Sequence, residues 1–183
     1  MTSRFSVMRH ELAHAEAYRI LGGGDEFLIW GECKGAKYWL CQQPENWDET
    51  NRIYQAASIL AGPASDYLYH TNGELTTWEA LKRDIEDLPH SAHDFTDIHK
   101  MWLSDDEFAD AAAFANRAAE EAKNWVRDNG DLFAEMVLES TFSDGLMVNM
   151  EKVRFSAVMN LSNLATPAEL AKLSRIIQRG TLH

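Results

Sequence analysis

Two histidines and a glutamate near the N-terminus form a His-Glu-x-x-His pattern, made by His10, Glu11 and His14. The pattern lies in the stretch Phe5–Leu21, which we predict to be one helix. Residues four apart share one face of a helix, so both imidazoles can approach the same metal ion. The neighbouring Glu11 can then reach a water molecule bound to that metal. We therefore predict a zinc site with His10 and His14 as ligands and Glu11 as general base.

The same spacing also suits three solvated side chains on the exposed face of a surface helix. Two observations favour the metal site over that alternative. Small residues surround the motif, at Ala13, Ala15 and Ala17, as expected of a helix that packs closely against a neighbour. The chain further on also supplies a candidate for a third ligand.

That candidate is Asp94, in a stretch that has the pattern of a helix start. Ser91 suits the N-cap position and Asp94 the third helical position, which together make a variant of the capping box. Asp94 then either caps this helix or projects from its first turn as a ligand towards His10 and His14. Nearby residues that compete for the ligand role are His90, His93, Asp97 and His99.

Length and composition indicate one folded domain. The chain has 183 residues, of which 45% are hydrophobic and six are Trp, and this is enough for a substantial core. It has no early apolar run of about 18 residues, so no transmembrane helix is predicted. A signal-peptide core is also missing, because Arg9, His10 and Glu11 interrupt the first apolar stretch. We therefore expect a cytoplasmic protein that does not associate with a membrane.

The formal net charge of −12 argues against a nucleic-acid partner, because surfaces that bind nucleic acid are normally basic. The two cysteines, Cys33 and Cys41, lie on either side of a predicted turn. Two reduced thiols are favoured over a disulfide in a chain without a secretory signal. The cysteines form no CxxC pattern, so we predict no separate zinc-thiolate site.

A Gly-rich break at residues 22–24 should end the first helix. Two apolar runs, Phe27–Trp30 and Lys37–Cys41, then flank a turn containing glycine and predict a β-hairpin. This hairpin either offers an edge for an extended substrate, by strand addition, or simply covers the first helix.

A second long helix should begin at Asn46 or Asp48 and run to about Tyr69, with Pro63 kinking or dividing it. Further predicted helices are 76 or 77 to about 88, 105–128 after a Ser104 cap, 131–140, and 167 to about 179 after a Thr166 cap. The segment 144–159 suits a strand or a helix equally and is left open. These elements predict a mainly α (α+β) fold in a single domain, 1–183. We divide it into a zinc-peptidase-like part, 1–103, and a helical C-terminal extension, 104–183.

Three separated pieces of the sequence resemble the peptidase domain of FtsH-type ATP-dependent proteases. The first is residues 10–15, which match the zinc-binding helix of that family. The second is residues 59–66, where a glycine and small residues precede an acidic position, as in the family's second helix. The third is residues 91–95, where an aspartate begins a helix. The three pieces occur in the family's order, and the resemblance covers about residues 8–102.

The resemblance implies a mostly helical zinc peptidase in which His10, His14 and Asp94 bind Zn²⁺ and Glu11 is the catalytic base. The expected activity is hydrolysis of a peptide or protein substrate. The sequence departs from the family in lacking membrane helices and an ATPase module ahead of the peptidase domain. Ala13 also replaces a glycine that is usual in the motif. We therefore expect a stand-alone peptidase-like protein, which either cuts flexible segments or has lost proteolysis.

Three alternatives remain open. The first is a peptidase of the repressor-cleaving kind, in which Asp66 on the second helix is the third ligand. The second is a zinc-stabilised binding or regulatory protein without turnover, whose fourth metal position is filled by a side chain such as His93. The third is a helical interaction module in which the motif is accidental. A homo-oligomer formed through the helical C-terminal half is compatible with each.

Overall fold

The computed structural model describes residues 4–30, 40–44, 50–84, 87–88 and 90–159. Its helices are α1 (Arg4–Ile20), α2 (Arg52–His70), α3 (Trp78–Asp84), α4 (Ala92–Ile98), α5 (Asp105–Asp128) and α6 (Gly130–Glu139). Its strands are β1 (Glu26–Trp30), β2 (Leu40–Cys41), β3 (Gly145–Asn149) and β4 (Arg154–Val158). The predicted mainly helical fold with a small sheet is confirmed.

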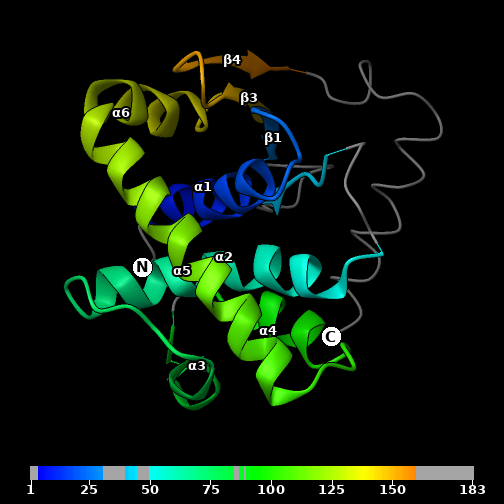
Figure 1. Ribbon diagram of the computed structural model, residues 1–183. Coiled ribbons are helices and arrows are strands. Elements are labelled where there is room, and N and C mark those ends of the chain that lie inside the picture. Colours follow the sequence, from blue (N-terminus) through cyan, green and yellow to red (C-terminus); the bar gives the residue numbers. More distant parts are fainter. Residues whose placement is uncertain (1–3, 31–39, 45–49, 85–86, 89, 160–183) are drawn as a thin grey trace.

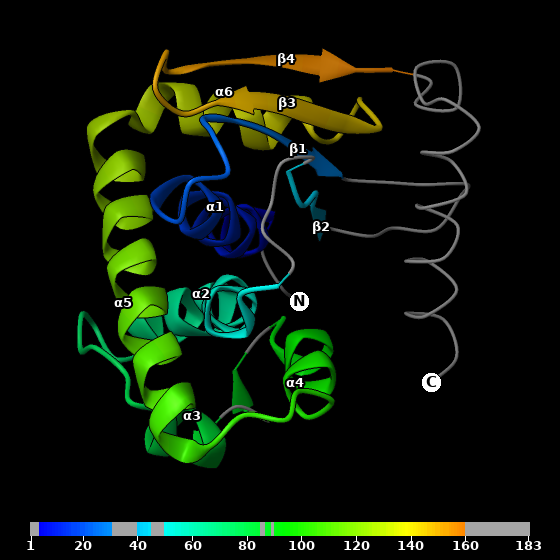
Figure 2. The same cartoon turned by 45° about the vertical axis from the view of Figure 1, so that its right-hand side comes forward.

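The elements are stacked in layers (Figures 1 and 2). The sheet lies on one side of α1, α2 lies on the other side of α1, and α3 and α4 follow beyond α2. The long helix α5 runs along the side of this stack and contacts both α1 and α2. As a result, α1 is enclosed by the sheet, α2 and α5, and side chains on its α2-facing surface are removed from water.

Alanines allow α5 to approach the other helices closely. The buried alanines of α5 are Ala111, Ala112, Ala115, Ala118, Ala119 and Ala122. They belong to one core cluster with Leu12 of α1, Leu60 of α2 and Val148 of β3. Residues from both predicted parts of the chain therefore share a single core.

The sheet is antiparallel throughout, in the order β2-β1-β3-β4. Phe27 of β1 pairs with Val148 of β3, and Ile29 pairs with Leu146, and all four side chains are buried. Cross-strand apolar pairs of this kind fix the register, because a slip of one residue would turn them towards solvent. The predicted pairing of the strands near residues 28 and 41 is confirmed, while its turn, 31–39, lies outside the described residues.

Two predicted helix boundaries depend on local hydrogen bonds. The first turn of α5 forms the expected capping box: Ser104 Oγ accepts from the Glu107 N–H at 3.3 Å, and the Glu107 carboxylate accepts from the Ser104 N–H at 2.8 Å. Such a cap contributes about 1 kcal/mol to stability. Thr77 Oγ1 likewise accepts from the Ala80 N–H at 3.1 Å where α3 begins. The helices predicted at 5–21, 105–128 and 131–140 are also confirmed.

The predicted start of α2 is wrong. Its N-cap is Asn51, whose side-chain oxygen accepts from the Tyr54 N–H at 3.2 Å. Asn46 and Asp48, the predicted caps, lie outside the described residues. Pro63 does not divide α2, which continues from Arg52 to His70. Pro63 is fully buried, and its packing in the core offsets the local cost of a proline within a helix.

Segment 144–159, left open by its sequence, forms β3 and β4. The predicted helix after Thr166 lies outside the described residues. Within the part of the chain that the structure describes, no helix combines the length and apolar character needed to span a membrane.

Candidate metal centre

The His-Glu-x-x-His histidines lie on the face of α1 that packs against α2. Their side chains are buried, with His10 2% and His14 9% exposed. Their rings lie 4.8 Å apart between centroids and meet edge to face at 77°. The predicted helix and spacing therefore bring both imidazoles to one point inside the protein.

Asp94 reaches the same point from the first turn of α4. Its Oδ2 lies 3.0 Å from His10 Nε2, and its Oδ1 lies 3.7 Å from His14 Nε2. One ligand atom from each of the three residues lies within 4.8 Å of the other two. His10, His14 and Asp94 therefore form a group that can hold a metal ion, and they are the three residues predicted as ligands.

Groups on α2 make hydrogen bonds with the Nδ1 atoms of both histidines. His10 Nδ1 lies 3.0 Å from Asp66 Oδ2, and His14 Nδ1 lies 2.7 Å from the Ser58 carbonyl oxygen. Metal-binding histidines usually donate this second N–H to a carboxylate or a backbone carbonyl, which fixes the ring and its tautomer. Both Nε2 atoms are thus left to face Asp94, so the donor set fits a metal ion.

Asp66 therefore does not occupy the ligand position considered for it. Its carboxylate lies on the Nδ1 side of His10, away from the Nε2 atoms. Ser91 Oγ donates to the same Asp66 oxygen at 3.2 Å. Ser91 occupies the predicted N-cap position of α4, but its side chain makes no capping hydrogen bond, so that part of the prediction is wrong. The Ser91 hydroxyl donates to the buried Asp66 carboxylate instead of capping α4.

His10, His14 and Asp94 shift the pKa values of one another. Burial opposes protonation of His10, but hydrogen bonds to Asp66 and Asp94 outweigh it and raise the pKa of His10 well above its usual value. Burial also opposes protonation of His14, and the nearby Asp94 carboxylate reverses the effect and raises its pKa. The histidines in turn lower the pKa of Asp94 despite its burial. These directions favour protonated histidines beside an ionised Asp94, and a metal ion that binds the imidazoles would displace those protons.

Gly62 of α2 lies directly against the two Nε2 atoms. A Cβ atom built on Gly62 would come 2.4 Å from His10 Nε2 and 2.5 Å from His14 Nε2. Glycine in a helix interior is destabilising by roughly 0.5–1 kcal/mol relative to alanine. The absence of a side chain here is what allows α2 to pass close to the ligand atoms.

Glu11, the predicted base, is 5% exposed and lies beside the ligands on α1. Burial raises the pKa of Glu11, and the neighbouring His14 and His10 offset this only in part. Its carboxylate also accepts a hydrogen bond from the backbone N–H of Cys41 on β2. The strand β2 therefore contacts Glu11, the residue predicted as general base, directly.

The other predicted candidates on α4 point elsewhere. His93 is half exposed, and its Nδ1 lies 3.6 Å from Asp97 Oδ2. Asp97 also accepts a hydrogen bond from Lys100 at 2.8 Å. The His99 ring packs edge-on against Phe95, with centroids 4.1 Å apart. None of these three competing side chains joins the group at Asp94.

His90 lies closer to the group. Its ring centroid is 5.7 Å from that of His10, and its Nε2 is 3.1 Å from Ser6 Oγ on α1. Partial burial lowers the pKa of His90, which favours the neutral imidazole near pH 7. The contacts made by His90, Gly62 and the Ser58 carbonyl were not predicted from sequence.

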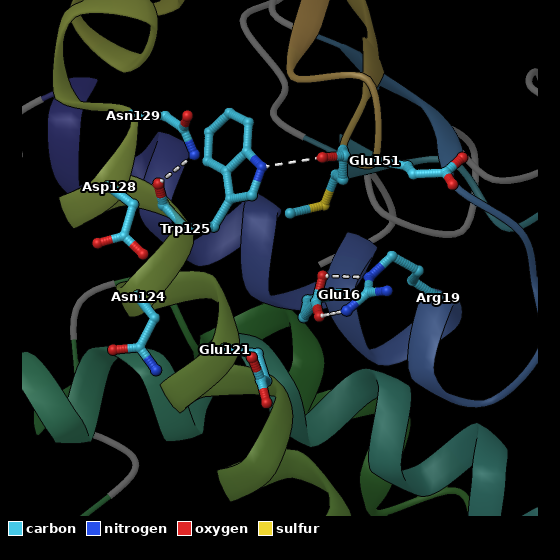
Figure 3. Close-up of a pocket in the computed structure, with 9 residues that line it drawn as sticks. Glu16, Arg19, Glu121, Asn124, Trp125, Asp128, Asn129 and Glu151 are labelled. Atoms are coloured by element: carbon cyan, nitrogen blue, oxygen red, sulfur yellow. Dashed lines mark hydrogen bonds and ion pairs between the residues drawn. The ribbon is translucent and has the colours of Figure 1, made fainter.

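A separate hollow of about 270 Å³ opens between the end of α1, the end of α5 and the turn from β3 to β4. Figure 3 shows Arg19 paired with Glu16 beside this hollow. The Trp125 indole N–H donates to the Met150 carbonyl oxygen at 3.1 Å. Its other lining residues are Glu121, Asn124, Asp128, Asn129 and Glu151. It shares no residue with the His10, His14 and Asp94 group.

Models of known protein families match no part of this chain, and no curated protein matches it either.

Proposed function

We propose that the protein is a zinc-dependent endopeptidase whose site resembles that of the FtsH-type peptidase domain. The observation that supports this most is the convergence of His10 Nε2, His14 Nε2 and Asp94, with both Nδ1 atoms held by α2. Two imidazoles and one carboxylate, with a further position open to water, are typical of catalytic zinc. The three residues cluster within the described part of the chain without a fourth ligand from His93.

Zinc held by this group would act as a Lewis acid and lower the pKa of a bound water to about 7. Glu11 follows His10 in the sequence and is buried beside it, which supports Glu11 as the group that would accept that proton. The hydroxide so formed would add to the carbonyl carbon of the peptide. Glu11 would then deliver the proton to the amine that leaves when the C–N bond breaks. The hydrogen bonds to Asp66 and the Ser58 carbonyl would keep the two imidazoles in their orientation during these steps.

The second candidate is a zinc-stabilised binding or regulatory protein. The observation that favours it is the burial of Glu11, which is 5% exposed and whose carboxylate already accepts a hydrogen bond from the backbone of β2. In that case the metal would support the fold and Glu11 would perform no proton transfer. Measuring turnover separates the two candidates.

The metal content of the purified chain tests the site. Protein purified without added metal or chelating resin should contain about one zinc per chain by elemental analysis. Asp94→Ala should weaken zinc binding by more than about 100-fold, since even outer-sphere changes cost 10–100-fold. Asp97→Ala, on the same helix but paired at the surface with Lys100, should keep the parent's affinity. Zinc near zero, unchanged after incubation with zinc, would overturn the proposal, as would iron, which similar ligand sets also bind.

Asp66→Asn tests the outer contact on His10. The amide keeps the shape of the side chain but removes the charge that faces His10 Nδ1 at 3.0 Å. We expect zinc affinity to fall by about 10–100-fold, measured by competition with a chromophoric chelator. Asp105→Asn is the control, because Asp105 also accepts hydrogen bonds, from Trp78 and Lys82, but away from the site. Equal affinity in both variants would show that Asp66 does not support the ligand.

A further inference from the structure

His90 has a backbone conformation that ordinary residues avoid. Its φ is +71°, and the other non-glycine residues with positive φ in the described part of the chain are Asn72 and Val153. A side chain in this region crowds its own backbone, and such strain persists only where the surrounding structure imposes it. The contacts of His90 identify what imposes it.

His90 and Ser91 attach the start of α4 to both neighbouring helices. The His90 imidazole lies 3.1 Å from Ser6 Oγ, one turn before His10 on α1. The Ser91 hydroxyl donates to Asp66 on α2 at 3.2 Å. The chain then enters α4, whose first turn carries Asp94. The position of the third ligand therefore depends on how this junction is held.

The His90 ring also supports the ligand His10 directly. The two rings meet edge to face at 72°, with centroids 5.7 Å apart. Asp66 already fixes His10 from its Nδ1 side. His90 therefore joins α1 and α4 at a point where one displacement would move two ligands.

We propose that His90 is a positioning residue of the metal centre: its left-handed backbone and its imidazole hold α4 so that Asp94 meets His10 and His14. This inference rests on the proposed zinc site. Backbone strain at His90 is then retained because it serves metal binding. A variant that relieves the strain should keep the stability of the protein but bind zinc more weakly.

His90→Gly tests whether zinc affinity falls while stability is unchanged. Glycine adopts positive φ without strain, so removal of the imidazole is offset by relief of the backbone. The melting temperature of the metal-free variant should stay within about 3 °C of the parent, because the two effects on stability oppose one another. Zinc affinity should nevertheless fall by about 10–100-fold. With Co²⁺ in place of zinc, the visible absorption bands should shift, because they report ligand geometry.

The chain supplies matched controls for the strain itself. Asn72→Gly and Val153→Gly relieve backbone strain of the same kind, at φ +58° and +48°, and neither residue belongs to the group of His10, His14 and Asp94. Both should keep the zinc affinity and Co²⁺ spectrum of the parent. His90→Asn, which tolerates positive φ and offers an amide to Ser6, should recover most of the affinity lost in His90→Gly.

Ser6→Ala provides a second test that does not alter the strained residue. Alanine favours helix more than serine, so the variant should fold, yet it removes the hydroxyl that lies against His90. Reduced zinc affinity with a shifted Co²⁺ spectrum supports the proposal. Parent-like zinc affinity in both His90→Gly and Ser6→Ala overturns it while leaving the zinc site intact. A parent that binds neither metal overturns the zinc site and this inference together.

Discussion

Glu11→Gln is expected to abolish peptide hydrolysis while zinc stays bound. Glutamine has nearly the same shape as glutamate but cannot accept a proton from water, and loss of a general base lowers the rate by roughly 10²–10⁴-fold. The ligand atoms belong to other residues, so the metal content should match the parent. The measurement is cleavage of fluorescently labelled casein, an unfolded substrate, alongside elemental analysis of each preparation.

Glu16→Gln is the matched control for that experiment. Glu16 is also a buried glutamate on α1, but its carboxylate pairs with Arg19, away from the ligands. The control should keep the parent's activity. A Glu11→Gln variant that cleaves casein as fast as the parent contradicts the role of Glu11. Zinc-loaded parent that shows no cleavage of casein or of a mixed peptide library would instead favour the zinc-stabilised binding protein.

Gly62→Ala is expected to remove metal binding through one methyl group. The added Cβ would approach His10 Nε2 at 2.4 Å and His14 Nε2 at 2.5 Å, so at least one imidazole must move from the ligand position. We expect zinc affinity to fall by more than about 100-fold, beyond the effect of an outer-sphere change. Chelator competition measures the affinity, and thermal melting of the metal-free protein measures the fold.

Gly130→Ala is the control for replacing a helical glycine by alanine where the added methyl group meets no other atom. Gly130 begins α6, and a Cβ built there meets no atom within 4 Å. Both variants place alanine in a helix, where it is favoured over glycine by about 1 kcal/mol. Gly130→Ala should therefore bind zinc as the parent does. Parent-like zinc affinity in Gly62→Ala would show that the two Nε2 atoms do not meet against Gly62.

The meeting of His10 with His14 could be predicted from sequence because its signal is local. His10 and His14 need only helical periodicity to share a face. Asp94 is one of several candidates near a helix start, and only the resemblance to the FtsH-type peptidase domain selects it. The role of Asp66 could not be predicted in this way. It depends on the register between α1 and α2, which decides whether a carboxylate faces Nδ1 or Nε2 of His10. Ser58 leaves even less trace, since it contributes a backbone carbonyl that any residue type would provide.

The open segment 144–159 illustrates a different limit. In β3, four of five residues are buried, so its apolar run has no alternation to distinguish a strand from a buried helix. Its strand conformation depends on pairing with β1, more than 100 residues earlier, where Phe27 meets Val148. Ser91 failed as a cap for a similar reason, because a tertiary partner outcompeted the local one.

The separation of the ligands along the chain has a thermodynamic consequence. His10 and Asp94 are 84 residues apart, and they meet at one point. A metal ion joining them would close a long loop and restrict the unfolded ensemble, as a covalent cross-link does. For a loop of this length the chain-entropy contribution is about 4–5 kcal/mol. Unlike a disulfide, this link would open and close with the concentration of free metal, so the global stability of the protein would follow metal supply.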